Sequence, residues 1–191
     1  RLCNVIHHCH RFQRILPRGR FRRQHHRIGP VINGPGHIRS LGTGVPIWTA
    51  WEVLVDFDHM TGILSNLTAS RVVSRNGNVL IVRQEGIARF GIFSYPFKAE
   101  REIRMEPQRR ILAKNLSGTL KRMESEVRLI PSGVGGVRIE YRAEFAFDSI
   151  IAGLFGVSFL NHEVEEQFQS IVAEMKRREA QAASDPLQPN R

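Results

Sequence analysis

The sequence predicts an α+β domain in which a curved antiparallel sheet of about seven strands packs around a long C-terminal helix. Between residues 68 and 147, strand-length segments of alternating apolar and polar residues follow one another, separated by turn residues. After them, apolar residues recur every three or four positions, as in an amphipathic helix. Before them lie a short strand and two short helical segments. This order of elements indicates a sheet with one face covered by a helix and one face in water.

The N-terminal part of the domain is expected to hold one strand and a helical pair. His37 to Gly44 is available for the first strand. Residues 46–67 carry apolar residues at helical spacing, with a sharp turn at residues 56–58. Pro46 suits the first turn of a helix because its fixed φ angle already matches. We therefore expect two short helices after the first strand, and we interpret three side chains as chiefly packing residues: Trp48, Trp51 and Val55.

Six further strands follow, and turn residues such as Asn76, Gly77 and Asn78 separate them. In the long strands the charged residues share one face and the apolar residues share the other, which predicts one wet face and one interior face. The expected strands are Thr68–Arg75, Val79–Phe90, Phe93–Met105, Arg110–Ser117, Thr119–Ile130 and Val137–Phe147.

The closing helix carries an apolar stripe from Leu160 to Met175. Acidic residues at 163–166 and basic residues at 176–178 complement the dipole of such a helix. The chain from Gln181 onward contains two prolines, and we expect it to be frayed.

The charge of the chain is concentrated at its N-terminus. The formal net charge is +10, but residues 1–40 hold nine Arg, six His and no acid, whereas residues 41–191 hold 19 Lys and Arg against 18 Asp and Glu. The folded part is therefore nearly neutral and gives no signal for specific nucleic-acid binding. We expect residues 1–36 to be a basic segment that is disordered or read in a wrong frame, residues 37–180 to be the domain, and residues 181–191 to be a disordered tail.

Cysteine usage and hydropathy say little about compartment. Cys3 and Cys9 stand near three histidines, but their spacing matches no standard zinc pattern, so we expect no metal site. No apolar run reaches the roughly 18 residues that a membrane span needs. The compartment and the oligomeric state stay open, with the cytoplasm slightly favoured. Because the chain begins at Arg1 rather than Met, the true N-terminus is open too.

Three stretches and the closing helix resemble the START-like (SRPBCC) polyketide cyclase/dehydrase group, which includes coenzyme Q-binding START proteins and ribosome-association toxin relatives. They are TAWEVLVDFDHMTGILSNLTASRVV, RQEGIARFGIFSYPF and GTLKRMESEVRLIP. The resemblance covers about residues 37–180 and implies a helix-grip fold, in which the sheet curls around the C-terminal helix. The shared motifs are structural, so the resemblance assigns no catalytic residue and no cofactor.

Small residues on the interior face predict a cavity between sheet and helix. They are Gly86, Ala88, Ala99, Ala113, Ser125 and Ala143. Large residues that would line its walls are Tyr95, Phe97, Phe145 and Phe159. A mostly apolar pocket with few polar groups suits a lipid, quinone or polyketide-like ligand. The alternative is a filled core, in which small and large residues interdigitate.

Five polar residues fall on the interior register: Gln84, Arg101, Asn115, Ser125 and Tyr141. A buried cation needs a partner, so Arg101 is a candidate anchor for a carboxylate, a phosphate or a quinone oxygen. Alternatively, Arg101 pairs with a core acid such as Glu163, or a bulge turns it to solvent. Tyr141 is interpreted as wall rather than acid. With the four aromatic residues above, these five form the predicted ligand site.

The apolar segment Ile150–Phe159 joins the last strand to the closing helix and contains two glycines. Two interpretations are open. The segment is a mobile lid that makes transient contact with a membrane, or it packs as the first turns of the helix.

Three functions compete, and we favour the first of them. The first is a non-catalytic carrier of a hydrophobic small molecule, the second a cyclase/dehydrase-type enzyme, and the third a ribosome-interacting module.

The only compact titratable cluster after residue 40 is Asp56, Asp58 and His59. These residues could act as an acid–base pair or, as we prefer, cap a helix.

Overall fold

The computed structural model describes residues 37–184 except 91, 121, 134 and 147–148. At residues 37–39, 90, 93, 145–146 and 149–161 it describes the backbone alone. Residues 1–36 and 185–191, on which we predict a basic segment and part of a disordered tail, lie outside the described residues.

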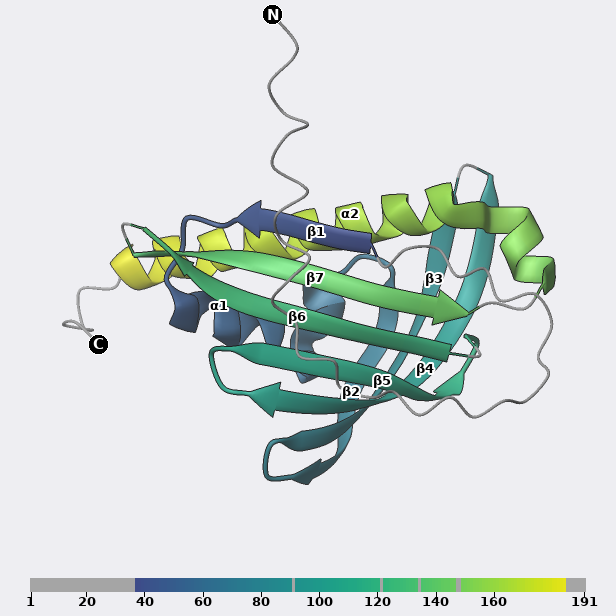
Figure 1. The fold of residues 1–191 in the computed structure, drawn as a ribbon, viewed down its shortest axis with the longest axis horizontal. Helices are drawn as coiled ribbons and strands as arrows, with labels where there is room; N and C mark the ends of the chain where they lie inside the picture. The colour runs from purple at the N-terminus through teal and green to yellow at the C-terminus, as the bar shows by residue number, and fades with distance from the viewer. Residues whose placement is uncertain (1–36, 91, 121, 134, 147–148, 185–191) are drawn as a thin grey trace, which may run out of the picture.

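One antiparallel sheet of seven strands forms the framework, in the order β1-β7-β6-β5-β4-β3-β2 (Figure 1). From β2 to β7 each strand pairs with its neighbour in the chain, and β1 pairs with β7. The predicted fold class is confirmed. The strands are β1 His37–Gly42, β2 Leu67–Asn76, β3 Val79–Phe90, β4 Phe93–Glu106, β5 Arg110–Gly118, β6 Arg122–Ser132 and β7 Gly136–Ala146.

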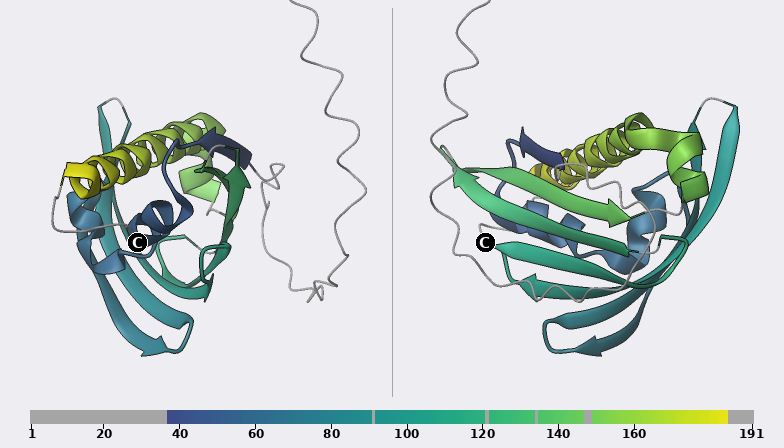
Figure 2. Two further views of the ribbon diagram at one scale, coloured as in Figure 1. Left: turned by 90° about the vertical axis from the view of Figure 1, so that its left-hand side faces the viewer. Right: turned by 45° about the vertical axis from the view of Figure 1, so that its right-hand side comes forward.

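Three helical elements complete the domain: α1 (Ile47–Leu54), the 3₁₀-helix η2 (Phe57–Gly62) and α2 (Ser149–Ser184). Figure 2 shows α2 lying across the open side of the curved sheet. Helix α1 packs beside the C-terminal half of α2, where the Thr49 hydroxyl donates a hydrogen bond of 2.5 Å to Glu179 Oε2.

The interior is packed at one end of the sheet. The ends of β3, β5, β6 and β7 nearest α1 contribute buried apolar residues, which pack against α1 and the second half of α2. Val53, Leu80, Val137, Ile139 and Met175 are almost completely inaccessible to solvent. This end of the domain is a close-packed core.

Trp48 does not have the predicted packing role. Half of its surface is exposed, whereas Trp51 and Val55 are partly buried against the core as expected. Helix α1 has only eight residues, and its buried face is formed by Thr49, Ala50, Val53 and Leu54. Trp48 lies off that face because the helical period turns it outward.

Residues 119 and 120 do not begin a strand as predicted. Thr119 is held against β4 instead: its N–H donates to Lys98 O at 2.8 Å, and its hydroxyl accepts from Lys98 N at 2.9 Å. Strand β6 starts at Arg122 and continues past the predicted end, because Pro131 still pairs in register with Val137.

Helix α2 follows one of the two open interpretations at its start and is longer than predicted at its C-terminal end. It begins at Ser149, so the backbone of Ile150–Phe159 forms the first turns of the helix, while the side chains there lie outside the described residues. It continues to Ser184, beyond the expected fraying at Gln181. Side-chain bonds one turn apart support this end: Arg177 Nη1 to Gln181 Oε1 at 2.9 Å, and Ser184 Oγ to Ala180 O at 2.8 Å. Within the described part of the chain, no helix is both long and apolar enough to cross a membrane.

Candidate functional site

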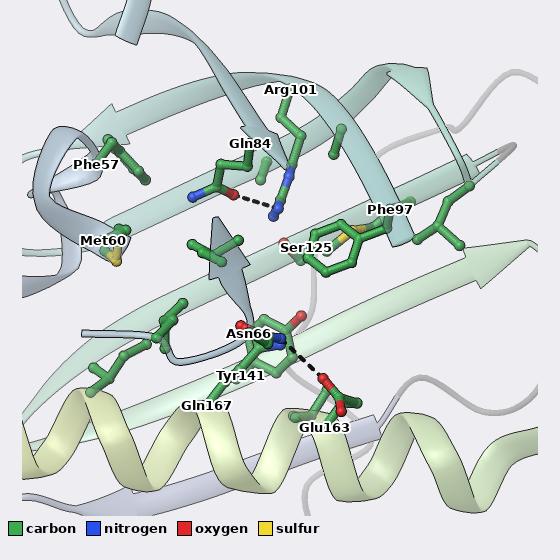
Figure 3. A pocket seen from close by; sticks show the side chains of 18 of the residues that line it. Phe57, Met60, Asn66, Gln84, Phe97, Arg101, Ser125, Tyr141, Glu163 and Gln167 are labelled. Carbon is green, nitrogen blue, oxygen red and sulfur yellow. Dashed lines mark hydrogen bonds between the residues drawn. The ribbon is translucent and has the colours of Figure 1, made fainter. Parts of the chain in front are cut away.

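A cavity of about 290 Å³ lies between the sheet and α2 and borders the packed core, because Leu54, Ile103, Ile111 and Ile139 of the core also line it (Figure 3). Strands β3 to β7, η2 and α2 all contribute to its walls. Most of the lining side chains are apolar, among them Phe57, Met60, Ile111, Met123, Val127 and Phe168.

Small side chains help to leave this space open. Ala88, Ala99, Ala113 and Ser125 line the cavity, as their interior register predicts. Ala143 is buried and is not part of the lining. Where the cavity lies, the interior is therefore not a filled core.

Six of the nine predicted site residues line the cavity: Gln84, Tyr95, Phe97, Arg101, Ser125 and Tyr141. Their role in binding a ligand stays a prediction. Asn115 is not part of the lining; it sits near the end of β5, where its Nδ2 donates to Leu120 O at 2.9 Å. Its side chain is engaged by the loop that follows β5. The side chains of Phe145 and Phe159 lie outside the described residues.

Arg101 lies in the protein interior, and part of its surface faces the cavity. Its Nη2 donates to Gln84 Oε1 at 2.5 Å. The pairing of β4 with β5 is shifted between Glu100 and Arg101, but this bulge does not turn Arg101 to solvent. The pairing with Glu163 is also wrong, because Glu163 Oε2 accepts from Asn66 Nδ2 at 3.0 Å instead. Among the described residues, no carboxylate lies within ion-pair distance of Arg101.

A chain of hydrogen bonds fixes the position of Arg101. Gln84 Nε2 donates to Ser70 Oγ at 3.0 Å, and the Ser70 hydroxyl donates to Phe57 O at 2.5 Å. The chain connects η2, β2, β3 and β4. With its Nε2 committed to Ser70, Gln84 presents its carbonyl oxygen to Arg101.

Burial changes the proton affinities of Arg101 and Tyr141. It lowers the pKa of Arg101, while the neighbouring Tyr141 acts in the opposite direction; an arginine nevertheless stays charged near neutral pH. Burial raises the pKa of Tyr141, against the charge of Arg101 and a hydrogen bond with Ser125. Tyr141 therefore keeps its proton at neutral pH. Its ring also contacts Phe168 of α2, with centroids 5.3 Å apart, so it forms part of the wall.

Five polar lining residues were not predicted as part of the site: Asn66, Lys98, Thr119, Glu163 and Gln167. Glu163 and Gln167 are one helical turn apart and reach toward the cavity from α2 (Figure 3). Both fall between apolar residues of the stripe on α2, and polar residues at such positions were the signal that could have revealed them.

The Asp56, Asp58 and His59 cluster lies outside the cavity lining. Asp56 lies at the N-cap position of η2, as predicted, but its side chain makes no capping hydrogen bond. Its carboxylate contacts His59 Nδ1 at 2.6 Å and Arg178 Nη2 at 2.7 Å, and Asp58 Oδ1 accepts from Val72 N at 2.7 Å. These residues fasten η2 to α2 and β2. Among the described residues that line the cavity, there is no Asp, His or Cys.

Residues 44–178 match the family described as polyketide cyclase / dehydrase and lipid transport. The chain belongs to this family. Its architecture is a START-like helix-grip fold, as the sequence resemblance implied. No curated protein matches the chain.

Solved structures with the same fold include proteins of both kinds that the family description names. The Zhui aromatase/cyclase from Streptomyces sp. R1128 is 16% identical, with a TM-score of 0.62 over 75% of this chain and 94% of that one. A START superfamily protein from Mycobacterium smegmatis is 9% identical, with a TM-score of 0.65 over 75% and 99%. A STAR-related lipid transfer protein from Xanthomonas axonopodis is 9% identical, with a TM-score of 0.57 over 72% and 83%. At these identities the likeness establishes the fold alone.

Proposed function

We propose that this protein binds and carries a hydrophobic small molecule in the cavity between the sheet and α2, without catalysing its conversion. Membership of the family suggests hydrophobic ligand binding or polyketide cyclase activity. We favour a carrier over an enzyme because of the residues that line the cavity. They are mostly apolar, and the described ones include no Asp, His or Cys. Such a lining suits binding better than nucleophilic or histidine-based chemistry.

The size of the cavity limits the ligand. A volume of about 290 Å³ is near the lower end of the roughly 300–1,000 Å³ typical of ligand pockets. A single chain or a compact ring system fits this volume, and a lipid, quinone or polyketide-like molecule can place such a part inside. The apolar start of α2, residues 150–159, is our proposed point of transient membrane contact, on the basis of its sequence.

An enzyme of the cyclase/dehydrase type is the second candidate. It is favoured by the presence of a protonated Tyr141 and a cationic Arg101 in one cavity, because both can donate hydrogen bonds to a carbonyl oxygen. Turnover of a polyketide-like substrate that is abolished in Tyr141→Phe would favour the enzyme over the carrier.

A neutral fluorescent probe tests the carrier proposal. We expect 1-aminoanthracene to bind the wild-type protein with increased fluorescence, because the probe is apolar and small. Ala99→Phe should weaken this binding by about tenfold or more, since the new ring fills space that Ala99 leaves open. Ala69→Phe is the matched control: it makes the same change at an exposed position on β2, and it should leave the affinity unchanged. Equal affinity of both variants and the wild type, or no binding by the wild type, contradicts the proposal.

A further inference from the structure

We infer that the carried ligand is a single-chain or compact monocarboxylate, whose anionic head binds Arg101 while its apolar remainder lies along the cavity wall. This inference rests on the proposed function and adds the chemical class of the ligand.

The charges that line the cavity favour an anion at Arg101. The described lining contains three formally charged residues: Lys98, Arg101 and Glu163. Lys98 is largely exposed and forms an ion pair with Glu85 at 3.4 Å. Glu163 reaches in from α2, on the side of the cavity opposite Arg101, and is held by Asn66 (Figure 3). Arg101 is an interior cation, and no described carboxylate lies close enough to compensate its charge.

A purely structural role does not account for the charge of Arg101. Its described hydrogen bond, to Gln84, joins neighbouring strands, and a neutral amide could make the same link. Burying a guanidinium costs far more free energy than burying a neutral group unless an anion compensates it. A ligand carboxylate supplies that compensation.

The geometry around Arg101 suits a carboxylate. A guanidinium has five N–H donors in a planar fork that matches the two oxygens of a carboxylate. Gln84 engages one nitrogen, Nη2, and the chain through Ser70 to Phe57 holds that contact in place. The side chain extends from β4 toward the centre of the cavity, toward the wall that holds Ser125 and Tyr141 (Figure 3). The phenol of Tyr141, which keeps its proton, can donate a further hydrogen bond to the same head group.

The volume restricts the rest of the molecule. A volume of about 290 Å³ lies near the lower end of the range for ligand pockets. That is enough for one medium-length chain or a small ring system. It is too small for the two acyl chains of a membrane phospholipid.

Calorimetric titration with two probes of the same chain length tests the inference. Decanoate carries the carboxylate, and decan-1-ol replaces it with a neutral hydroxyl. We expect the wild-type protein to bind decanoate about tenfold or more tightly than decan-1-ol, because a charged hydrogen-bonded pair is worth more than a neutral one. Arg101→Gln should remove this preference and leave the affinity for decan-1-ol within about twofold.

The matched control is Arg104→Gln, an exposed arginine three residues further along β4, which is bonded to Glu102 at 2.7 Å. It should bind both probes as the wild type does. Equal binding of decanoate and decan-1-ol by the wild type, or unchanged decanoate affinity in Arg101→Gln, overturns the inference while leaving the carrier proposal intact. The wild-type comparison does not depend on any variant folding. If the wild type binds neither probe nor 1-aminoanthracene, the carrier proposal itself fails.

Discussion

At Gly86, β3 lies against the segment that precedes β2. A Cβ atom added there would lie 2.2 Å from Asn66 O and 2.6 Å from Phe97 Cζ. Asn66 O cannot withdraw without losing the hydrogen bond that it accepts from Ile87 N at 2.8 Å. A glycine at this position therefore allows two strands and the cavity wall to approach one another.

We predict that Gly86→Ala destabilises the fold by about 1–3 kcal/mol, the usual cost of overpacking. Urea unfolding followed by circular dichroism measures the change. Gly62→Ala is the control, because an added Cβ there meets nothing within 4 Å, and it should change stability by less than about 0.5 kcal/mol. Equal stability of both variants would contradict this prediction and would show that the backbone at Asn66 shifts to accommodate the added Cβ at little cost.

Arg101 and Asn115 show how far the sequence predicts the position of a single side chain. Strand alternation places both on the interior face, and they do pair in register. Only Arg101 reaches the cavity, because Asn115 is near the strand end and bonds to Leu120 in the loop. Periodicity gives the face of a residue, whereas its partner depends on loop geometry that periodicity does not encode.

At the scale of elements, α2 is fastened to the N-terminal helices by polar contacts as well as by apolar packing. Arg178 reaches Asp56 at 2.7 Å, and Thr49 donates to Glu179. Glu174 accepts hydrogen bonds of 2.7 Å from both Arg177 and Arg178, and so orients the latter. The group joins segments more than 100 residues apart, so the sequence gives no local sign of it.

The carboxyl of Glu174 makes this contact sensitive to acid. Hydrogen bonds from Arg177 and, secondarily, Arg178 lower the pKa of Glu174 from 4.5 to about 2, although burial opposes them. Ionised Glu174 therefore stabilises the folded state fully above about pH 4.5, and this contribution disappears as the pH falls toward 2. For Asp56, burial would raise the pKa, but His59 and Arg178 lower it overall, so its contribution is lost in the same direction.

We predict that Glu174→Gln lowers the free energy of unfolding by about 1 kcal/mol near neutral pH, and that its difference from the wild type shrinks at about pH 3. Urea titrations at both pH values measure the two differences. Glu52→Gln, which changes an exposed acid on α1, is the control and should have little effect at either pH. A difference of the same size at both pH values would show that Glu174 does not act through its charge.

The starts of β3 and α2 show which element boundaries can be predicted from the sequence and which cannot. The turn at Asn76 to Asn78 marks the start of β3 clearly, and the predicted range Val79–Phe90 is the observed one. The start of α2 at Ser149 lacks such a signal, because the apolar run with two glycines that follows is compatible with a loop or a helix. The helical backbone there results from the packing of the segment across the sheet, and not from the intrinsic helix propensity of its residues.

At the scale of the whole molecule, the core around α1 fills one end of the sheet, and the cavity extends from the edge of this core toward the other end. The alternation of strand residues predicted this fold, whereas the small residues on the interior face, together with the family resemblance, favoured a cavity over a filled core without excluding the latter. Glu163 and Gln167 were not assigned to the site, because their approach to the sheet depends on how α2 crosses it. That crossing is a long-range property, set by packing along the whole length of the helix.

The central claim is that this cavity holds a hydrophobic small molecule, and native mass spectrometry tests it most directly. The wild-type protein and Ala99→Phe are each incubated with an organic extract of the cells that produce the protein, then measured intact. We predict a noncovalent complex with one small molecule for the wild type, which denaturation releases, and only the bare chain for Ala99→Phe. A bare wild-type chain, or equal complexes for both proteins, would contradict the account.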